Sequence, residues 1–184
     1  FKVSLSGAET MISYSLEVFW LMALSIAFPT VSGSLKEVIK IVNYAKEHKI
    51  PITGRSGGTN LTGNAVGEGI IIDFSKMNKI LSVTRDYVIV EPGVILDDLN
   101  EALGNKFFPI VPEDSSICTI GGMCGINSTG IYQRKYGRMK DWVMEVEMVD
   151  GNGKLGRYEN EVVGTEVILG LFTKIKLCII DKIP

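Results

Sequence analysis

The chain has 184 residues, of which 46% are hydrophobic and 22% charged, so it is long enough for one globular domain or two small lobes that share a core. Its formal net charge is -2 and its basic residues are scattered among acidic ones, which excludes the basic face that nucleic-acid binding requires. The cysteines Cys118, Cys124 and Cys178 lack the paired spacing of a zinc site or a disulfide framework, so we expect a reducing compartment.

Residues 18–28 are the most hydrophobic stretch of the chain. The stretch is shorter than the roughly 20 residues that a membrane-spanning helix needs. Glu9 and Glu17 stand where a secretory signal would carry basic residues. We therefore expect no transmembrane segment, and a stretch that is buried or covers the surface of a partner. Because the first residue is Phe1 rather than methionine, we also expect the chain to be a piece of something longer.

Local patterns predict helices and strands in alternation over the first half of the chain. A capping box at 34–37 and apolar residues at helical spacing predict a helix over 34–48, with His48 solvated near its end. The helix leads into a short strand at 51–53, so we expect the order strand, helix, strand, loop. The sequence also predicts strands at 69–74, 80–83 and 87–91, and a short helix over 96–103 capped by Gly104.

The second half of the chain has a different pattern. Residues 107–137 show little periodicity, and a long segment without regular structure usually wraps a ligand or a partner. Residues 142–149 alternate as in a strand, a turn at 150–153 leads to a return strand, and 171–179 alternate again.

Residues 51–63 form a glycine-rich stretch that suits phosphate binding. Gly54, Gly57, Gly58 and Gly63 can adopt positive φ, so successive backbone N–H groups can converge on one anion. Hydrogen bonds to charged groups contribute about 1.5–3 kcal/mol each. Four or five such amides would therefore supply most of a micromolar affinity of about 8 kcal/mol. The alternative is a glycine-rich surface turn without a ligand.

A second segment with similar chemistry lies at 111–123. Its short hydroxyl side chains can bond ligand oxygens, while Gly121 and Gly122 would let a flat ring or a phosphate approach the main chain. Residues 127–130 and 135–137 repeat this chemistry. Each segment by itself also fits turn and cap residues without a ligand.

Taken in order, these segments resemble the flavin-binding domain of the vanillyl-alcohol oxidase superfamily, also called the PCMH-type FAD domain. The branch that they resemble most is that of D-lactate dehydrogenase and glycolate oxidase. The matching residues are Pro51 with GRSGGTNLTG at 54–63, VEPGV at 90–94, PEDSS at 112–116 with CTIGG at 118–122, KYG at 135–137, and GTE at 164–166 with LG at 169–170. The resemblance covers about residues 29–180. It implies an α+β fold in which one FAD-binding domain has two small α/β lobes, about 29–91 and about 92–184, with the cofactor between them.

The resemblance also implies which residues hold FAD. Backbone amides of the first loop would cradle the pyrophosphate, the second segment would pass along the flavin and its ribityl chain, and Glu166 with the backbone near Leu171 would lie toward the adenosine half. The implied cofactor-binding residues are Arg55, Ser56, Gly57, Gly58, Thr59, Asn60, Gly63, Pro112, Asp114, Ser115, Ser116, Thr119, Gly121, Gly122, Ser128, Gly130, Tyr136, Gly137, Glu166 and Leu171.

The residue at position 59 bears on how the flavin is held. Some relatives attach it covalently through a histidine after the paired glycines of the first loop, where this chain has Thr59, so we expect non-covalent FAD. Cys118 stands near the place where certain oxidases carry a cysteinyl link. Its spacing to residues 119–121 differs from theirs, which favours a packed thiol.

Three departures from the family pattern bear on cofactor binding. Val167 stands where members usually carry glycine, and a side chain there could crowd the turn or the cofactor. The segment between Lys154 and Gly164 is shorter than the corresponding segment commonly is in the family. Residues 10–28 lack the acidic and polar lead-in of relatives.

The chain lacks the groups that the resembling enzymes use on their substrate. In those enzymes a second domain brings histidines, often with a metal, that deprotonate a 2-hydroxy acid while its α-hydride moves to the flavin. Here His48 is the one histidine, and no cluster has metal-ligand spacing, so no catalytic residue is assigned.

We therefore expect an FAD-binding domain or subunit of a flavin-dependent 2-hydroxy-acid dehydrogenase or oxidase. A missing cap domain or a partner subunit would complete it, and alone it would turn over slowly or not at all. We expect it in the cytoplasm, with any membrane association arising through a partner.

Two alternatives stay open. One is a non-catalytic module that keeps the fold, has lost FAD and docks a partner through residues 18–28. The other is the related sugar-nucleotide reductase branch, which would require NADPH oxidation and which the motif at 135–137 fits less well.

Overall fold

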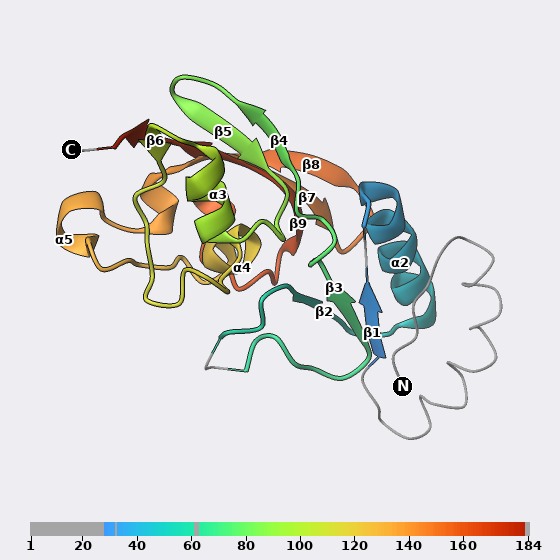
Figure 1. Ribbon diagram of the computed structural model, residues 1–184. Coiled ribbons are helices and arrows are strands. Elements are labelled where there is room, and N and C mark those ends of the chain that lie inside the picture. Colours follow the sequence, from blue (N-terminus) through green and yellow to red (C-terminus); the bar gives the residue numbers. More distant parts are fainter. Residues whose placement is uncertain (1–27, 32, 61–62, 183–184) are drawn as a thin grey trace.

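The computed structural model describes residues 28–31, 33–60 and 63–182. The hydrophobic stretch 18–28 falls outside this part of the chain except for its last residue. In chain order the elements are β1 (Phe28–Val31), α2 (Leu35–His48), β2 (Ile52–Arg55), β3 (Ile70–Asp73), β4 (Ile80–Val83), β5 (Tyr87–Val90), α3 (Leu96–Ala102), β6 (Lys106–Phe107), α4 (Ile120–Gly125), α5 (Gln133–Tyr136), the 3₁₀ turn η1 (Met139–Asp141), β7 (Val143–Asp150), β8 (Leu155–Tyr158), the 3₁₀ turn η2 (Asn160–Val162), β9 (Gly170–Cys178) and β10 (Ile180–Asp181) (Figure 1).

A three-stranded parallel sheet holds the N-terminal part of the described chain. Its order is β1-β3-β2, and α2 connects the two outer strands (Figure 1). All three isoleucines of the central strand, Ile70 to Ile72, are buried, which is typical of a strand inside a parallel sheet. Val38 and Ile41 of α2 belong to the same hydrophobic cluster as Ile70 and Ile72. The predicted order of strand, helix, strand and loop is confirmed.

Helix α2 begins and ends where the sequence predicts. The Ser34 side chain accepts the N–H of Glu37 at 3.4 Å, as the capping box requires. The Glu37 carboxylate accepts the N–H of Gly33 at 2.8 Å, one residue before the predicted partner. His48 is exposed and stacks on Tyr44, and Lys49 ends the helix in the left-handed conformation.

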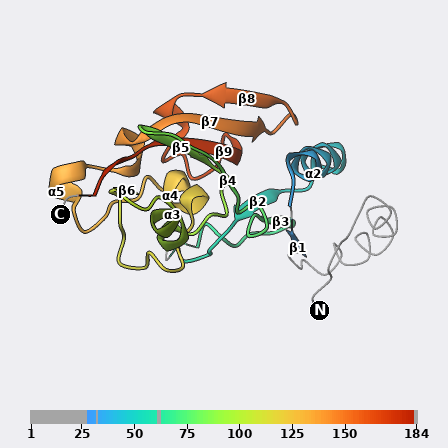
Figure 2. The same ribbon diagram turned by 45° about the horizontal axis from the view of Figure 1, so that its top comes forward.

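A five-stranded antiparallel sheet forms the larger layer. Its order is β4-β5-β9-β7-β8, and α3 and α4 lie against one face (Figure 2). Leu99 of α3 and Met123 of α4 share a hydrophobic cluster with residues of β5, β7 and β9. Charged side chains elsewhere on the sheet pair across strands, as where Lys174 meets Glu147 at 3.0 Å. This arrangement of helices with an antiparallel and a parallel sheet is the predicted α+β fold.

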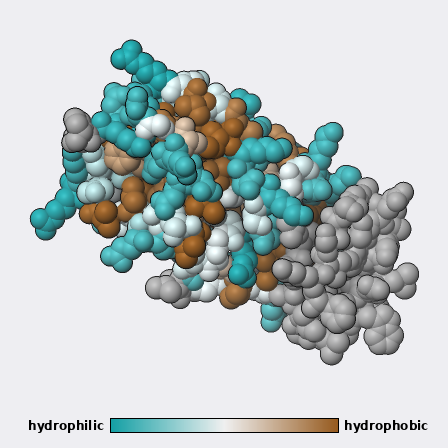
Figure 3. Space-filling view, in the orientation of Figure 1, coloured by the Kyte–Doolittle hydropathy of each residue, from teal (hydrophilic) through white to brown (hydrophobic). Residues whose placement is uncertain are grey.

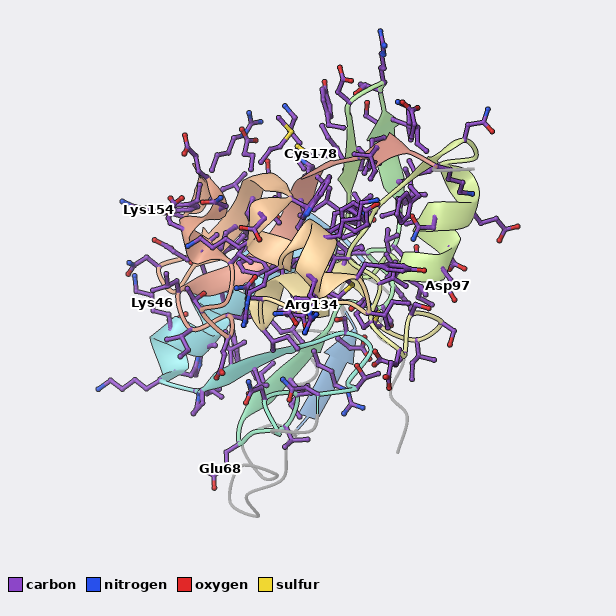
Figure 4. All side chains as sticks on the ribbon, turned by 90° about the vertical axis from the view of Figure 1, so that its left-hand side faces the viewer. Lys46, Glu68, Asp97, Arg134, Lys154 and Cys178 are labelled. Carbon is purple, nitrogen blue, oxygen red and sulfur yellow. The ribbon has the colours of Figure 1, made fainter. Side chains whose placement is uncertain are left out.

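The two sheets are joined through shared side chains. Val149 of β7 and Leu171 of β9 belong to the hydrophobic cluster of the smaller sheet. Lys46 of α2 also donates to Asn152 in the β7–β8 turn at 3.0 Å. Lys46 and Lys154 accordingly lie on the same side of the molecule, while Asp97 marks α3 on the opposite side (Figure 4).

The boundary between the two sheets falls earlier in the chain than the expected boundary between the two lobes near residue 91. Strands β4 and β5 fall within the expected first lobe of about 29–91, yet β5 pairs with β9 and β4 with β5. The sheets therefore separate between β3 and β4, because main-chain hydrogen bonds tie both later strands to the second sheet. The division into two lobes itself stays a prediction.

Two further local predictions need correction. The alternation over 142–149 is interrupted, because the register of β7 against β9 shifts between Val143 and Glu145 and again between Glu147 and Met148. The segment 107–137 is not wholly irregular, since it contains α4 and α5. A sequence with adjacent glycines gives little sign of a helix, and α4 forms through tertiary packing described below.

The surface mixes hydrophilic and hydrophobic side chains over the face seen in Figure 3. Ile168, with 83% of its surface exposed, is the most exposed large hydrophobic side chain of the described residues. No helix in the described ranges combines the length and the apolar character that crossing a membrane requires.

Candidate functional site

A cavity of about 550 Å³ opens between the residues that follow β2 and those around α4. The loop from Gly54 to Asn60 lines one part of it, and residues between Pro112 and Thr129 line another. Glu166 and Val167, which precede β9, complete the wall. Both glycine-rich segments of the sequence thus border the same cavity.

The two segments touch each other directly. The hydroxyl groups of Ser56 and Thr119 are joined by a hydrogen bond. A Cβ placed on Gly57 would lie 2.6 Å from the carbonyl oxygen of Ile117, so only glycine permits this approach of the two backbones. Ser56, Gly57 and Thr119 also line a second cavity of about 210 Å³ and therefore form a thin partition.

The first loop offers consecutive backbone donors to the cavity. No hydrogen bond joins the N–H groups of Ser56, Gly57, Gly58 or Thr59 to any residue in the described ranges. Of the glycines in this loop, Gly58 and Gly63 adopt positive φ, at 68° and 82°, whereas Gly54 and Gly57 do not. A row of free amides in a turn of this kind suits an anion.

Arginine side chains add positive charge to the cavity. A Cβ on Gly58 would come within 2.9 Å of a terminal guanidinium nitrogen of Arg55, so this cation packs along the loop. Arg138 lines the cavity as well, beside the second segment. Asp114 and Glu166 contribute the acidic lining groups.

Asn64 supplies a further donor that the sequence analysis missed. Its side-chain nitrogen Nδ2 is buried and has no hydrogen-bond partner among the described residues, and the residue lines the cavity. Leaving a buried donor unpaired is costly, and such groups in native proteins usually meet a ligand or water. The free amides, the arginines and this amide donor together fit a phosphate-bearing ligand.

The glycines of the second segment serve packing as well as access. A Cβ on Gly121 would lie 2.6 Å from the Cβ of Pro92, and the Gly121 N–H donates to the Pro92 carbonyl at 2.8 Å. Thr119 caps α4 by accepting the N–H of Gly122 at 3.4 Å. Gly122 is exposed and lines the cavity, so a flat or anionic group can reach the backbone there, whereas Gly121 borders the cavity but is buried against Pro92.

Cys118 is a packed thiol on the cavity wall. It is 5% exposed, and its Sγ lies 3.7 Å from the sulfur of Met123. Burial, with a smaller contribution from the charges of Asp114 and Asp97, raises the pKa of Cys118 to about 12. Burial also raises the pKa of Cys124. Both thiols therefore stay protonated and weakly nucleophilic at neutral pH.

Thirteen of the implied cofactor-binding residues line the cavity. They are Arg55, Ser56, Gly57, Gly58, Thr59, Asn60, Pro112, Asp114, Thr119, Gly121, Gly122, Ser128 and Glu166.

The other seven are placed outside this lining, several with clear structural roles. The Ser115 carbonyl accepts the N–H of Asp97 at 3.4 Å, while Tyr136 accepts the Trp142 indole N–H through its carbonyl at 2.6 Å. Gly137 has a φ of 73° and ends α5. The full set outside the lining is Gly63, Ser115, Ser116, Gly130, Tyr136, Gly137 and Leu171.

Several lining residues were not among those implied by the motifs. Asn64 and Arg138 come directly after the matched motifs, and this position is the one signal that could have indicated them. Phe74 and Phe172 read as ordinary core residues in the sequence. The additional lining residues are Gly54, Asn64, Ala65, Phe74, Pro92, Cys118, Met123, Gly125, Ile126, Asn127, Thr129, Arg138, Val167 and Phe172.

A tight turn at 165–168 carries Val167 into the lining. The Ile168 N–H donates to the Thr165 carbonyl at 3.1 Å, and Glu166 and Val167 both have positive φ, at 54° and 65°. These φ signs are those of a type I′ turn, which favours Asn-Gly. A β-branched residue in this conformation is a genuine outlier.

The described part of the chain contains no group of three or more histidine, cysteine, aspartate or glutamate side chains that could hold a metal ion. His48, on α2, is not among the residues that line the cavity.

The chain matches one family of known proteins over most of its length. The sequence profile described as "FAD binding domain" matches residues 30–158. The chain therefore belongs to the FAD-binding domain family, and the cavity between its two glycine-rich segments is the place at which its fold offers anion-binding groups.

Among curated relatives, the chain is similar to the glycolate oxidase subunit GlcD of Bacillus subtilis, with 33% identity over 165 residues, 79% of this chain and 35% of the relative. It is also 33% identical over 178 residues to the mitochondrial D-lactate dehydrogenase [cytochrome] of Arabidopsis thaliana, covering 86% of this chain and 30% of the relative. D-2-hydroxyglutarate dehydrogenase of Escherichia coli is 31% identical over 137 residues, 72% of this chain and 14% of the relative. The chain thus spans about a third or less of the length of these relatives.

Solved structures agree on the fold. An alkyldihydroxyacetonephosphate synthase superposes with a TM-score of 0.74 at 22% identity, covering 83% of this chain and 31% of the other. A variant of Phl p 4, described as a glucose oxidase, gives a TM-score of 0.73 at 21% identity, covering 83% and 34% of the two chains. At such identities the likeness shows a shared fold and nothing further.

Proposed function

We propose that the chain is the FAD-binding part of a flavin-dependent dehydrogenase or oxidase that acts on 2-hydroxy acids of the D-lactate or glycolate kind. The observation that carries this proposal is the row of amides from Ser56 to Thr59, which have no hydrogen-bond partner among the described residues and are held against the second segment through Thr119. The names of the curated relatives, a glycolate oxidase subunit and D-2-hydroxy-acid dehydrogenases, favour the substrate class.

The pyrophosphate of FAD is the group that the first loop would hold. Its charge suits the free amides of residues 56–59 and the guanidinium of Arg55 packed over Gly58. Asn64 Nδ2 would donate to a ligand oxygen, since it has no partner among the described residues. The hydroxyl and main-chain groups around Thr119 and Gly122 would border the remainder of the cofactor.

The flavin supplies the redox chemistry when bound, by accepting an electron pair from the substrate. The chain's own contribution is to bind and orient the cofactor. We propose that FAD is held without a covalent bond, because Thr59 occupies the position after the paired glycines and the Cys118 thiol is protonated, with a pKa raised to about 12. Substrate deprotonation would require groups supplied from outside the described residues.

A cap domain or partner subunit would supply those groups. The relatives are about three times as long as the matched part of this chain, which leaves room for such a domain. We further propose a reducing, cytoplasmic setting, consistent with three free cysteines, and association with a membrane through a partner.

The cofactor proposal is tested by titrating the purified apo-protein with FAD and following flavin fluorescence and the visible absorbance band. We expect one FAD per chain, with a Kd on the order of 1 μM, and removal of the cofactor by denaturation without covalent residue. FAD that elutes separately from the protein in gel filtration at about 100 μM would contradict the proposal.

The substrate proposal needs a separate experiment. Anaerobic D-lactate or glycolate should bleach the bound flavin only slowly in this chain alone, and faster when the proposed cap domain or partner subunit is present. Failure of both D-lactate and glycolate to bleach the flavin when that domain or subunit is present would argue against the proposed substrate class.

A non-catalytic module is the second candidate, and one observation favours it. Val167 projects into the cavity from a turn with positive φ, where its side chain takes space that a ligand would use. A folded protein that binds no FAD in the titration above would support this candidate.

A further inference from the structure

The side chain of Val167 lies between two glycines of the cavity lining, Gly54 and Gly125. A Cβ on Gly125 of α4 would lie 3.1 Å from Val167 Cγ2, and one on Gly54 of β2 would lie 3.7 Å from Cγ1. The two facing residues are glycines, so no side chain of theirs enters this space. The isopropyl group of Val167 fills it and packs against both hydrophobic clusters.

The turn that carries Val167 prevents its side chain from moving aside. The N–H groups of Gly164 and Glu166 donate to the carbonyls of Cys124 and Gly125 at 2.9 and 2.8 Å. The Ile168 N–H closes the turn on the Thr165 carbonyl at 3.1 Å. Two hydrogen bonds to α4 and one within the turn thus fix the backbone and with it the direction of the Cα–Cβ bond.

This backbone is also strained for the residue it carries. Val167 has a φ of 65°, and Glu166 before it has a φ of 54°. L-residues other than glycine pay a steric cost in this region, and branching at Cβ increases it. The same conformation costs glycine nothing.

We propose that the Val167 side chain limits the affinity of this cavity for FAD, and that residue 167 sets how far a planar ring of the cofactor can enter between Gly54 and Gly125. The inference rests on the proposed function, because it concerns how tightly the same site holds its cofactor. Residue 167 would then have two separable effects. Its side chain limits FAD binding by occupying space, and its positive φ lowers the stability of the fold.

Two substitutions separate the effects. Val167→Ala removes both γ-carbons from the cavity and keeps a side chain in the left-handed turn, whereas Val167→Gly also removes the conformational cost. Both variants should bind FAD about tenfold more tightly, since relief of overpacking is common to them. Val167→Gly should in addition have an unfolding equilibrium constant about fivefold smaller than that of Val167→Ala.

The experiment is a fluorescence titration of the full chain with FAD, together with urea unfolding of the apo-protein, on wild type and both variants. Ile168→Ala is the matched control, because Ile168 lies in the same turn, is 83% exposed and does not line the cavity. The control should bind FAD as wild type does.

The possible outcomes distinguish the inference about Val167 from the proposed function on which it rests. Tighter binding by both variants, or binding by the variants alone, supports the inference. Wild-type binding that neither variant improves, or an equal gain in Ile168→Ala, overturns the inference and leaves the proposed function standing. Absence of binding in wild type and in both variants overturns the proposed function and the inference with it.

Discussion

The hydroxyl groups of Ser56 and Thr119, 63 residues apart in the sequence, are joined by a hydrogen bond at the edge of the cavity. Ser56 belongs to the first glycine-rich segment and Thr119 to the second, where it also caps α4. This bond therefore couples the loop that carries the free amides to the segment that faces it. A ligand that contacts both segments would depend on their relative position.

Removing that bond should weaken both stability and cofactor binding. Ser56→Ala should destabilise the apo-protein by about 1 kcal/mol, the usual net contribution of such a bond, and Thr119→Val by about 2 kcal/mol because it also removes the cap of α4. In a double-mutant cycle measured by urea unfolding, the coupling energy should be about 0.5–1.5 kcal/mol. Ser75→Ala serves as the control, because Ser75 bonds Asp73 through its backbone N–H, which the substitution keeps. Additive single effects would show that the bond does not couple the segments.

The close approach of Gly57 to the second segment should tolerate no side chain. In Gly57→Ala the new Cβ would lie 2.6 Å from the Ile117 carbonyl oxygen, so the two segments must separate. We expect a loss of about 1–3 kcal/mol in unfolding free energy, as for other overpacked contacts, and weaker FAD binding. Gly151→Ala is the control, because nothing lies within 4 Å of its added Cβ. It should leave stability unchanged or slightly raised. Wild-type affinity for FAD in Gly57→Ala would count against the two-segment site.

Asn64 should affect binding and stability in opposite directions. Its buried Nδ2 lacks a partner among the described residues, so Asn64→Ala removes a desolvation cost from the apo-protein. Urea unfolding should show equal or greater stability, while the Kd for FAD should rise by about tenfold because a donor to the cofactor is lost. Asn105→Ala, exposed on the loop after α3, should change neither quantity. A variant that is less stable but binds FAD normally would assign Asn64 a structural role instead.

Alkaline pH should destabilise the fold through its buried thiols. Burial raises the pKa of Cys118 from 9.0 to about 12 in the folded protein. The unfolded chain therefore loses this proton first as pH rises. The stability contributed by the protonated thiol is complete below about pH 9 and is lost as pH rises toward about 12.

The loss from one such group is at most about 1.4 kcal/mol per pH unit within that window. Urea unfolding of wild type and Cys118→Ala at pH 7.5 and pH 10 measures it, and the variant should show the smaller decrease. Cys178→Ala, at a half-buried position, is the comparison. An identical pH dependence in wild type and Cys118→Ala would show that Cys118 ionises as readily in the folded chain as in the unfolded one.

The sequence predicts those helices and strands that local residue patterns determine. The helix at 35–48 follows from the Ser34 cap and its apolar spacing, and the buried strand at 70–73 from three consecutive isoleucines. Helix α4 was not predicted, because its adjacent glycines disfavour a helix by themselves. It forms where Thr119 caps it and where Gly121 packs without a side chain against Pro92.

The motifs likewise indicate the two segments of the site but not all of its lining. Asn64 and Val167 contribute through the positions of a side-chain nitrogen and an isopropyl group, and these depend on the packing of both sheets. Tyr136 was implied by its motif, yet its ring packs edge to face with Trp142 outside the cavity lining. A motif specifies which backbone turns can form, whereas the tertiary contacts decide which side chains face the ligand.

Amide hydrogen exchange of the full chain with and without FAD tests most directly whether one cofactor spans both segments. We predict that FAD slows exchange at residues 56–59 and, in the same titration, around Gly122, because the cofactor contacts both glycine-rich segments where they border the same cavity. Protection of only one of these segments at saturating FAD would contradict the account.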